Sequence, residues 1–570
     1  MLRRLCLLSL IACASAQAQV RTVFETDSNQ TASYEACNAY YHKLCEAYRR
    51  IPDLQGMAPL FFSIGKSDGL RDIMVMQVNS PLGRKADLRP SILINNAIHA
   101  GEPEGVDASM ALARDILADA KHWKHLLTHY RLFIIAQYNV DGIERRGCCS
   151  RANQDGPDEY GFRASARNLD LNRDFIKADS RNAETFIRFF TRINARIFVD
   201  NHTSNGADYP YTLTYFGTHP AKLNADERRT MKGLCSALDS VLPSRGWPVV
   251  PYVETRREVP DSGINGFFDG GRYATGFAAL HHCLGFTVET HMLKPFPQRV
   301  RATYAFMEAL LEQLNQHNLV WPEEPQTSDW QVLSWKQSNT TQDSLLFSGY
   351  HAAYKPSKVT GQQRLYYDRT QPWQKRIPFY NTWIPVDSVR MPKAYFISPA
   401  WREVIDRLEW NGIQGETITR EETMRLGASY IVHHEAARNP YEGHFLHQHT
   451  RSRDTVLTMK VQPGWVKYTV TPRNSRFLAQ VLHPEAPDSY FNWNFFDAIL
   501  QQKEWYSAYV FEEKAEAFLA QNPSVKAQFE ARRAADPAFA SDGFAQLYWI
   551  YKQSPWYEGT NNLYPVFRME

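Results

Sequence analysis

The chain has 570 residues, which is enough for several domains of about 150 residues each and for a large buried core without structural staples. Hydrophobic residues make up 44% and charged residues 22%, an ordinary globular composition that excludes an intrinsically disordered chain. A formal net charge of +3 gives no strong electrostatic field, which argues against nucleic acid or a general membrane surface as the partner. We therefore expect a small substrate or a peptide.

The first predicted segment is a signal peptide over residues 1–18. Arg3 and Arg4 precede an apolar run from Leu5 to Ala12, and Ala16-Gln17-Ala18 fits a small-residue cleavage site. The run is shorter than the roughly 20 apolar residues that a membrane helix needs, and no later run reaches that length. We therefore expect an exported protein, periplasmic or extracellular, with no membrane span.

Cysteine positions leave two questions open. Leu10-Ile11-Ala12-Cys13 resembles a bacterial lipobox, so a lipid anchor on Cys13 is an alternative to a soluble product. Export permits disulfides, but spacing does not fix the pairing, and buried free thiols are the alternative. Cys37 and Cys45 lie about 12 Å apart along one predicted helix, too far to bond to each other. The cysteines beyond the signal peptide are Cys37, Cys45, Cys148, Cys149, Cys235 and Cys283.

The next elements predict an α/β fold with a largely parallel sheet. Residues 32–51 carry apolar side chains at spacings of three and four, which is typical of an amphipathic helix. Beyond them, strand-like apolar runs alternate with helix-like segments, as in α/β layer architectures. The strands are predicted at 92–94, 132–136, 197–199 and 286–288, and the helices near 106–118, 182–193, 223–242 and 300–318.

A second region begins at the Pro- and Glu-rich linker 321–325. We therefore expect a catalytic-type domain at 19–320 and a β-rich α+β region at 321–570, whose role the sequence does not assign. Alternating stretches at 455–461 and 466–470, joined at Pro463-Gly464, predict a β-hairpin. Helical patterns return near 500–533.

One histidine carries the pattern of a metal ligand. A catalytic zinc takes three ligands from histidine and carboxylate side chains and keeps a fourth position for water. Of the 18 histidines, only His99 has an acidic residue, Glu102, three positions on. This pair follows the predicted strand 92–94, and open α/β sheets place their sites at the carboxyl ends of strands. An isolated H-x-x-E also arises by chance, so a third ligand is needed.

His202 is the candidate for that third ligand. It ends the predicted strand 196–202, and Asp200 lies two residues back on the same face. A carboxylate there can orient a ligating imidazole, or it can be an ordinary solvated side chain.

Two further motifs point to peptide hydrolysis. Asn172-Arg173 lies between the metal segments, and a guanidinium is suited to clamp a substrate carboxylate. Glu289 ends the apolar strand 285–290, where a buried carboxylate is costly without a partner or a task. We therefore predict Glu289 as the carrier of protons.

In this order and spacing, these residues resemble the M14 zinc carboxypeptidase family over residues 30–318. The resemblance implies a mixed sheet with helices on both faces and a single zinc ion held by the three ligands. It implies hydrolysis of a peptide bond at or near a free C-terminus, with peptides, protein C-termini and cell-wall peptides as partners. Glu289 would be the catalytic base.

The resemblance also bears on four further positions. Arg151 lies near where the family keeps an arginine beside the developing oxyanion. Tyr273 either replaces the family's tyrosine upstream of the catalytic glutamate or belongs to the core. Arg272 either reaches an acidic group of the specificity pocket or forms a surface ion pair. Gly101 stands where typical digestive members have an arginine, so one substrate contact is missing.

Two other functions remain open at this stage. A zinc amidase or deacylase of the related aspartoacylase type shares the ligand pattern, and a non-catalytic peptide-binding protein can share the fold. The cluster of His444, His447 and His449 lacks carboxylate or cysteine partners at ligand spacing beyond Glu442, so we do not expect a second metal there.

Overall fold

A computed structural model describes residues 20–570, except 53, 55, 84–86, 318, 320, 322–323, 327 and 342. The predicted signal peptide and the lipid anchor at Cys13 lie outside the described residues. No helix within the described part of the chain has the length and apolar character to cross a bilayer.

An eight-stranded mixed sheet forms the centre of the N-terminal region, in the order β1-β2-β4-β3-β5-β10-β6-β7. The neighbours β4, β3, β5 and β10 run parallel, whereas β2 is antiparallel to β4 and β6 is antiparallel to β10. The strands are β1 (Met57–Lys66), β2 (Asp72–Pro81), β3 (Ser91–Asn95), β4 (Arg131–Ile135), β5 (Ala195–Ser204), β6 (Leu213–Gly217), β7 (Val249–Pro251) and β10 (Leu284–His291). The expected mixed, largely parallel sheet is confirmed.

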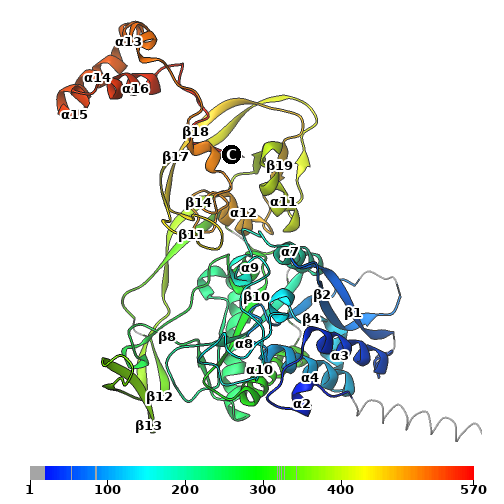
Figure 1. Cartoon of the computed structure of the whole chain (residues 1–570). Coiled ribbons are helices and arrows are strands. Elements are labelled where there is room, and N and C mark those ends of the chain that lie inside the picture. Colours follow the sequence, from blue (N-terminus) through cyan, green and yellow to red (C-terminus); the bar gives the residue numbers. More distant parts are fainter. Residues whose placement is uncertain are drawn as a thin grey trace, which may run out of the picture.

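Helices cover both faces of this sheet (Figure 1). Side chains alternate along a strand, so Ile92 and Ile94 of β3 pack into one core and Leu93 packs into the other. The first core contains α3 (Tyr34–Ala47), α4 (Glu104–Ala118), α8 (Ala225–Ser244) and α10 (Phe296–Gln316), and the second contains α7 (Arg181–Ile193) and α9 (Ala274–Leu280). Shorter helices are α2 (Val23–Thr26), α5 (Lys124–His129) and α6 (Val140–Ile143). The predicted strands 92–94, 197–199 and 286–288 lie inside the longer strands β3, β5 and β10, and 132–136 is shifted by one residue from β4. The predicted helices overlap α3, α4, α7, α8 and α10.

A buried carboxyl group in α4 makes stability depend on pH. Burial raises the pKa of Asp107 to about 7, although a hydrogen bond from Thr31 opposes the shift. Between about pH 4 and 7 the carboxyl group is protonated in the folded state and ionised in the unfolded state. The free energy of unfolding should therefore decrease as the pH rises from about 4 to 7, and it should not change further above pH 7. The difference is on the order of 4 kcal/mol.

Asp107→Asn should remove this decline, because the amide is neutral at every pH. Urea unfolding measured from pH 4.5 to 8 should show a variant that gains stability over the wild type as pH rises. Asp119→Asn, at the exposed end of the same helix, is the control and should keep the wild-type slope. An Asp107→Asn variant with that slope would contradict the assignment.

The C-terminal region is built on a six-stranded sheet in the order β16-β19-β15-β20-β17-β18. Its strands are β15 (Ala394–Ile397), β16 (Glu416–Thr417), β17 (Glu422–Ala436), β18 (His447–Val461), β19 (Val466–Thr469) and β20 (Leu563–Met569). Two helices accompany it, α11 (Arg402–Trp410) and α12 (Ser475–Leu482), and a separate helical group follows as α13 (Ala508–Gln521), α14 (Pro523–Ala535), α15 (Pro537–Ala540) and α16 (Gly543–Gln553). Figure 1 shows this helical group projecting from the far end of the region.

The predicted hairpin at 455–470 is wrong in its pairing. Both strands exist, but β18 pairs with β17, and β19 pairs with β15 and β16. After Pro463, Gly464 donates a backbone hydrogen bond to Ile418, which leads the chain to β16 instead of back along β18. The Pro463-Gly464 pair therefore predicts a turn between two strands, but it does not determine which strands pair with each other.

The two regions share a core. Phe198 and Phe277 of the N-terminal region belong to the same buried cluster as Tyr395, Phe477 and Trp493. A long arm, β12 (Ser344–Pro356) and β13 (Gln363–Tyr380), also leaves the paired strands β11 (Trp330–Gln337) and β14 (Trp383–Arg390) and runs down to β8 (Glu254–Thr255) and β9 (Ile264–Asn265), as Figure 1 shows. The C-terminal sheet therefore packs against the N-terminal region, and the arm extends the β8–β9 pair.

Candidate active site

Two histidines and a glutamate converge beside the carboxyl ends of β3 and β5. His99 and Glu102 lie in the turn between β3 and α4, and His202 lies in β5. All three are buried, and one ligand atom from each lies within 4.8 Å of the others. The Nδ1 atoms of the two histidines are 3.3 Å apart, and they lie 3.1 and 3.2 Å from the two carboxylate oxygens of Glu102.

This arrangement fits a bound cation. The Nε2 atoms face carboxylates, that of His99 at 3.0 Å from Asp170 and that of His202 at 2.7 Å from Asp200, so we place the ring hydrogens on Nε2. The Nδ1 lone pairs and the carboxylate of Glu102 then meet with no hydrogen between them, which is favourable only around a positive charge. Two imidazole nitrogens and a carboxylate are a donor set that zinc takes in catalytic sites.

The surroundings of His202 also favour positive charge. Burial lowers the pKa of His202, but Asp200 and Glu102 outweigh it and raise the pKa well above its usual value. Burial likewise opposes ionisation of Glu102, yet His99 and Arg151 hold its pKa well below the usual range. A cation bound between the two histidines and Glu102 would balance the negative charge of Glu102 and Asp200.

Asp170 is a functional residue that the sequence analysis missed. Its Oδ1 faces His99, while its Oδ2 accepts a hydrogen bond from Arg163 at 2.8 Å. Burial raises its pKa, but His99 and Arg163 together hold the pKa well below the usual value. A carboxylate behind a ligating histidine orients the ring and strengthens the ligand. The position of Asp170, two residues before Asn172, could have suggested a site residue. Only the fold shows that its carboxylate reaches His99.

Asp170→Asn should weaken zinc binding by about 10–100-fold, because the ring of His99 loses its charged partner. Competition with a chromophoric chelator measures this affinity directly. Asp158→Asn, an exposed residue on the neighbouring loop, should leave the affinity unchanged. Equal affinity of Asp170→Asn and wild type would exclude the role of Asp170 in holding the ligand.

Glu289 lies next to the metal centre by strand register. It pairs with His202 across the parallel strands β10 and β5. Its side chain lines the cavity, and desolvation by the surrounding protein raises its pKa to about 8, against the lowering effect of His202. A carboxyl group that titrates near neutral pH can both accept and return a proton.

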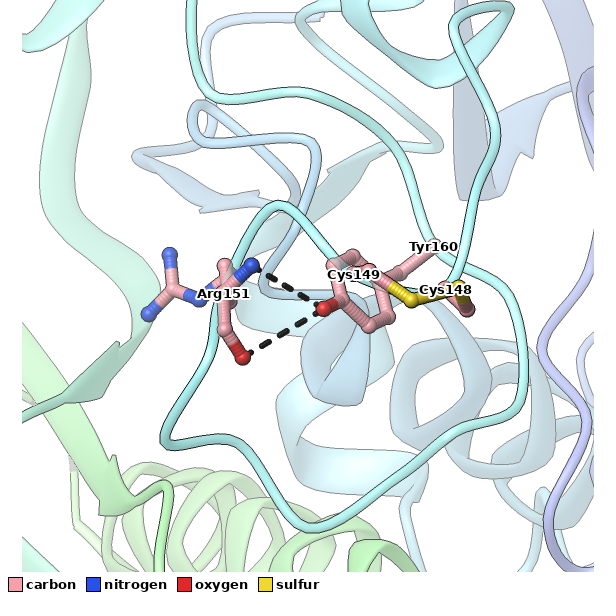
Figure 2. Close-up of a disulfide and its surroundings, with 4 residues drawn as sticks. All are labelled: Cys148, Cys149, Arg151 and Tyr160. Atoms are coloured by element: carbon pink, nitrogen blue, oxygen red, sulfur yellow. Dashed lines mark hydrogen bonds between the residues drawn. A yellow bond between two sulfur atoms is a disulfide. The ribbon is translucent and has the colours of Figure 1, made fainter.

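Arg151 reaches the centre from a loop closed by Gly147 and Tyr160 (Figure 2). Its backbone N–H donates to the Tyr160 hydroxyl, and the disulfide Cys148–Cys149 lies at the base of the loop. The guanidinium donates to Glu102 at 2.7 Å and to the Thr203 carbonyl at 2.9 Å. Cys37 and Cys45 do not bond to each other, as expected, and both are free, as are Cys235 and Cys283.

Arg151 explains why residue 101 is a glycine. A Cβ atom at Gly101 would lie 2.8 Å from Cδ of Arg151 and 3.1 Å from the Gly161 carbonyl oxygen. The space beside Glu102 is therefore filled by Arg151. Arg163, which the sequence analysis did not single out, adds a second guanidinium 3.5 Å from Glu102 and also lines the cavity.

The remaining predicted contacts divide into two groups. Arg173 lines the cavity and lies over the ring of Tyr273 at 4.3 Å, and Asn172 accepts a hydrogen bond from the backbone of Ala274. Arg272 does not line this cavity. Its guanidinium bonds to Asp488 at 2.7 Å and lies over the ring of Trp493, so the ion-pair alternative describes it, in a buried form shared with the C-terminal region.

One cavity of about 250 Å³ thus holds most of the predicted site. Its lining contains the metal ligands, Glu289 and three arginines, with an aromatic and polar wall opposite. The lining includes His99, Glu102, His202, Glu289, Arg151, Arg163, Asn172, Arg173, Phe216, Tyr252, Phe267, Asp269, Tyr273, Thr275 and Thr287. The structure brings these side chains together, and the catalytic roles of Glu289, Arg151, Asn172, Arg173 and Tyr273 stay predictions. Of the predicted histidine cluster, His444 pairs with Asp179 and His447 with Asp497.

The fold is an α/β architecture, and its centre carries a donor set that can hold one metal ion. Residues 48–189 match the Peptidase_M14 family model, described as zinc carboxypeptidase. Residues 48–189 thus resemble an M14 zinc carboxypeptidase domain, and the donor set of the centre can hold the single zinc ion of such a domain.

Carboxypeptidases are among the proteins similar to this chain at low identity. The chain is 22% identical over 365 residues to probable carboxypeptidase 2 of Arthroderma benhamiae, covering 60% of this chain and 63% of that protein, and so spans less than two thirds of it. It is 21% identical over 441 residues to carboxypeptidase 2 of Trichophyton rubrum, covering 72% and 74%. A metallo-carboxypeptidase structure from Burkholderia cenocepacia aligns with a TM-score of 0.36 at 14% identity, over 50% of this chain and 70% of that one.

Proposed function

We propose that the protein is a zinc-dependent carboxypeptidase that cleaves a peptide bond at or near a free C-terminus. The observation that carries this proposal is the convergence of a His-Glu-His centre, a carboxyl group of raised pKa and Arg173 around one cavity. Zinc, when bound, supplies a Lewis acid that polarises the scissile carbonyl group and makes water more acidic. Proton transfer, substrate binding and stabilisation of the oxyanion are assigned to side chains of the protein.

Glu289 takes a proton from the attacking water and returns it to the leaving amine, which is general base followed by general acid catalysis. Arg173 holds the terminal carboxylate of the peptide through paired N–H donors, and its stacking on Tyr273 fixes the plane of the guanidinium. Arg151 lies next to Glu102 and stabilises the negative charge that develops on the carbonyl oxygen.

Arg151→Ala should lower kcat by about 10²–10³-fold, the usual effect of removing one donor to an oxyanion. Zinc content, measured at saturating zinc, should stay at one equivalent. Arg146→Ala, at the base of the same loop and bonded to backbone carbonyls, is the matched control and should leave kcat unchanged. Turnover equal to the wild type would remove Arg151 from the reaction.

A pair of peptides tests the proposed function. The same sequence is offered with a free C-terminus and with a C-terminal amide, with and without a chelator. We expect zinc-dependent release of C-terminal residues from the free peptide alone. Cleavage of blocked or N-acylated substrates would support the amidase or deacylase alternative, and zinc binding without hydrolysis would support a non-catalytic binding protein.

We further propose that the protein is exported and acts in the periplasm or outside the cell on peptides, cell-wall peptides included. Residues 1–18 support this proposal through their basic start, apolar run and Ala-Gln-Ala site. N-terminal sequencing of the protein from the producing cell tests it. A mature chain that begins after Ala18 is expected, whereas a lipid-modified Cys13 would replace the soluble product with an anchored one.

A further inference from the structure

A wall of three aromatic rings closes one side of the catalytic cavity. Phe216, Tyr252 and Phe267 contact one another with ring centroids 4.9 to 6.1 Å apart. The same three residues line a second cavity of about 410 Å³. These rings therefore separate the catalytic cavity from a larger space behind it, and we name them the ring partition.

The C-terminal region holds the chain on both sides of Phe267. On one side, β9 pairs with the end of β13, and Gly266 donates a backbone hydrogen bond to Tyr380 at 2.7 Å. On the other side, Phe268 stacks on Trp383 with centroids 4.4 Å apart and also contacts Trp335.

Asn381 makes the contact at Gly266 a tight one. A Cβ atom on Gly266 would lie 1.8 Å from Oδ1 of Asn381, 2.6 Å from Cγ and 2.9 Å from Cβ. The backbone of Asn381 is held in turn, because its carbonyl oxygen accepts a hydrogen bond from His219 at 3.1 Å. Asn381 also lines the second cavity, so it supports the ring partition from behind.

We infer that Asn381 and Tyr380 of the C-terminal region are positioning residues that set the depth of the cavity available to the side chain of the substrate's last residue. This inference rests on the proposed carboxypeptidase function. It gives residues 321–570 a role in selectivity: the arm carries no group to the reaction but fixes where the ring partition stands.

Gly266→Ala tests the inference in the full-length zinc enzyme with two peptides that differ only in their last residue, alanine or tryptophan. The added methyl group meets Asn381 and pushes the ring partition toward the catalytic cavity. KM for the tryptophan peptide should rise by about tenfold, the scale of one methylene in a pocket, while KM for the alanine peptide and both kcat values change by less than about twofold.

A second substitution provides the rescue. In Gly266→Ala/Asn381→Gly the space for the methyl group is restored and the side chain that supports the ring partition is gone, so KM for the tryptophan peptide should fall to the wild-type value or below it. Equal changes for both peptides, or no rescue, would overturn the inference. If wild-type protein cleaves neither peptide, the proposed function itself fails, which is a separate outcome.

Phe267→Ala probes the same partition from the catalytic side if Gly266→Ala does not fold. Removing the ring joins the two cavities, so KM for a peptide ending in naphthylalanine should fall relative to KM for the alanine peptide. An unchanged ratio of these KM values would show that the ring partition does not limit the cavity, and the inference would be rejected.

Discussion

Replacement of Glu289 by glutamine should lower kcat by about 10²–10⁴-fold while zinc stays bound. Glutamine has nearly the shape of glutamate but cannot accept the proton of the attacking water. Glu289 lies in register with His202 without being one of the three converging ligands, so the ion should remain. Steady-state kinetics with zinc analysis on the same samples measures both quantities.

The pH profile separates this role from a structural one. Glu289 must be ionised to take a proton, so kcat/KM of the wild type should rise with pH through the pKa of this group. That pKa is about 8 without the ion, and a nearby divalent cation lowers it, so the rise should occur below pH 8. Glu289→Gln should lose this limb of the profile.

Glu254→Gln on β8 is the control, because it removes an exposed carboxyl group, also of raised pKa, that does not line the cavity. The Glu254→Gln variant should keep the wild-type kcat and the rise of kcat/KM with pH. A Glu289→Gln variant with wild-type kcat would assign the proton transfer to another group.

The metal ligands were predictable because each lies beside a strong local signal. His99 and Glu102 follow an apolar strand within one turn, and His202 ends another. Parallel strands bring their carboxyl ends to one edge of a sheet, so the prediction of a largely parallel sheet was enough to place these residues at the same edge.

Contacts made by chain segments far apart in sequence were not predictable. Arg272 pairs with Asp488, 216 residues away, and no local pattern distinguishes that partner from a substrate group. Asp170 illustrates the same limit, since its place behind His99 depends on how the loop after α6 folds back. The long arm reaches Gly266 through backbone pairing, which leaves no trace in side-chain periodicity.

His202→Ala should remove the metal. Loss of a carboxylate that only supports a ligand lowers metal affinity by at most about 100-fold, and loss of a ligand should lower zinc affinity by more than that. The variant loses one of three ligands and leaves Asp200 buried without its partner, which adds a cost in stability. Activity should fall to the background, and zinc should be absent after dialysis against a weak chelator.

His447→Ala is the control for loss of a buried histidine, since His447 bonds to Asp497 in the C-terminal region and contributes nothing to the centre. It should keep zinc and activity. A His202→Ala variant that retains one equivalent of zinc would disprove the ligand assignment.

Thermal unfolding distinguishes a lost ligand from a damaged fold. An ion that binds the folded state alone raises the unfolding temperature by mass action, so a chelator should lower Tm of the wild type. His202→Ala should have a Tm near that of the chelated wild type and show no further decrease with chelator. Because Asp200 loses its partner in the variant but not in the chelated wild type, any additional loss of Tm measures that buried charge and not the metal.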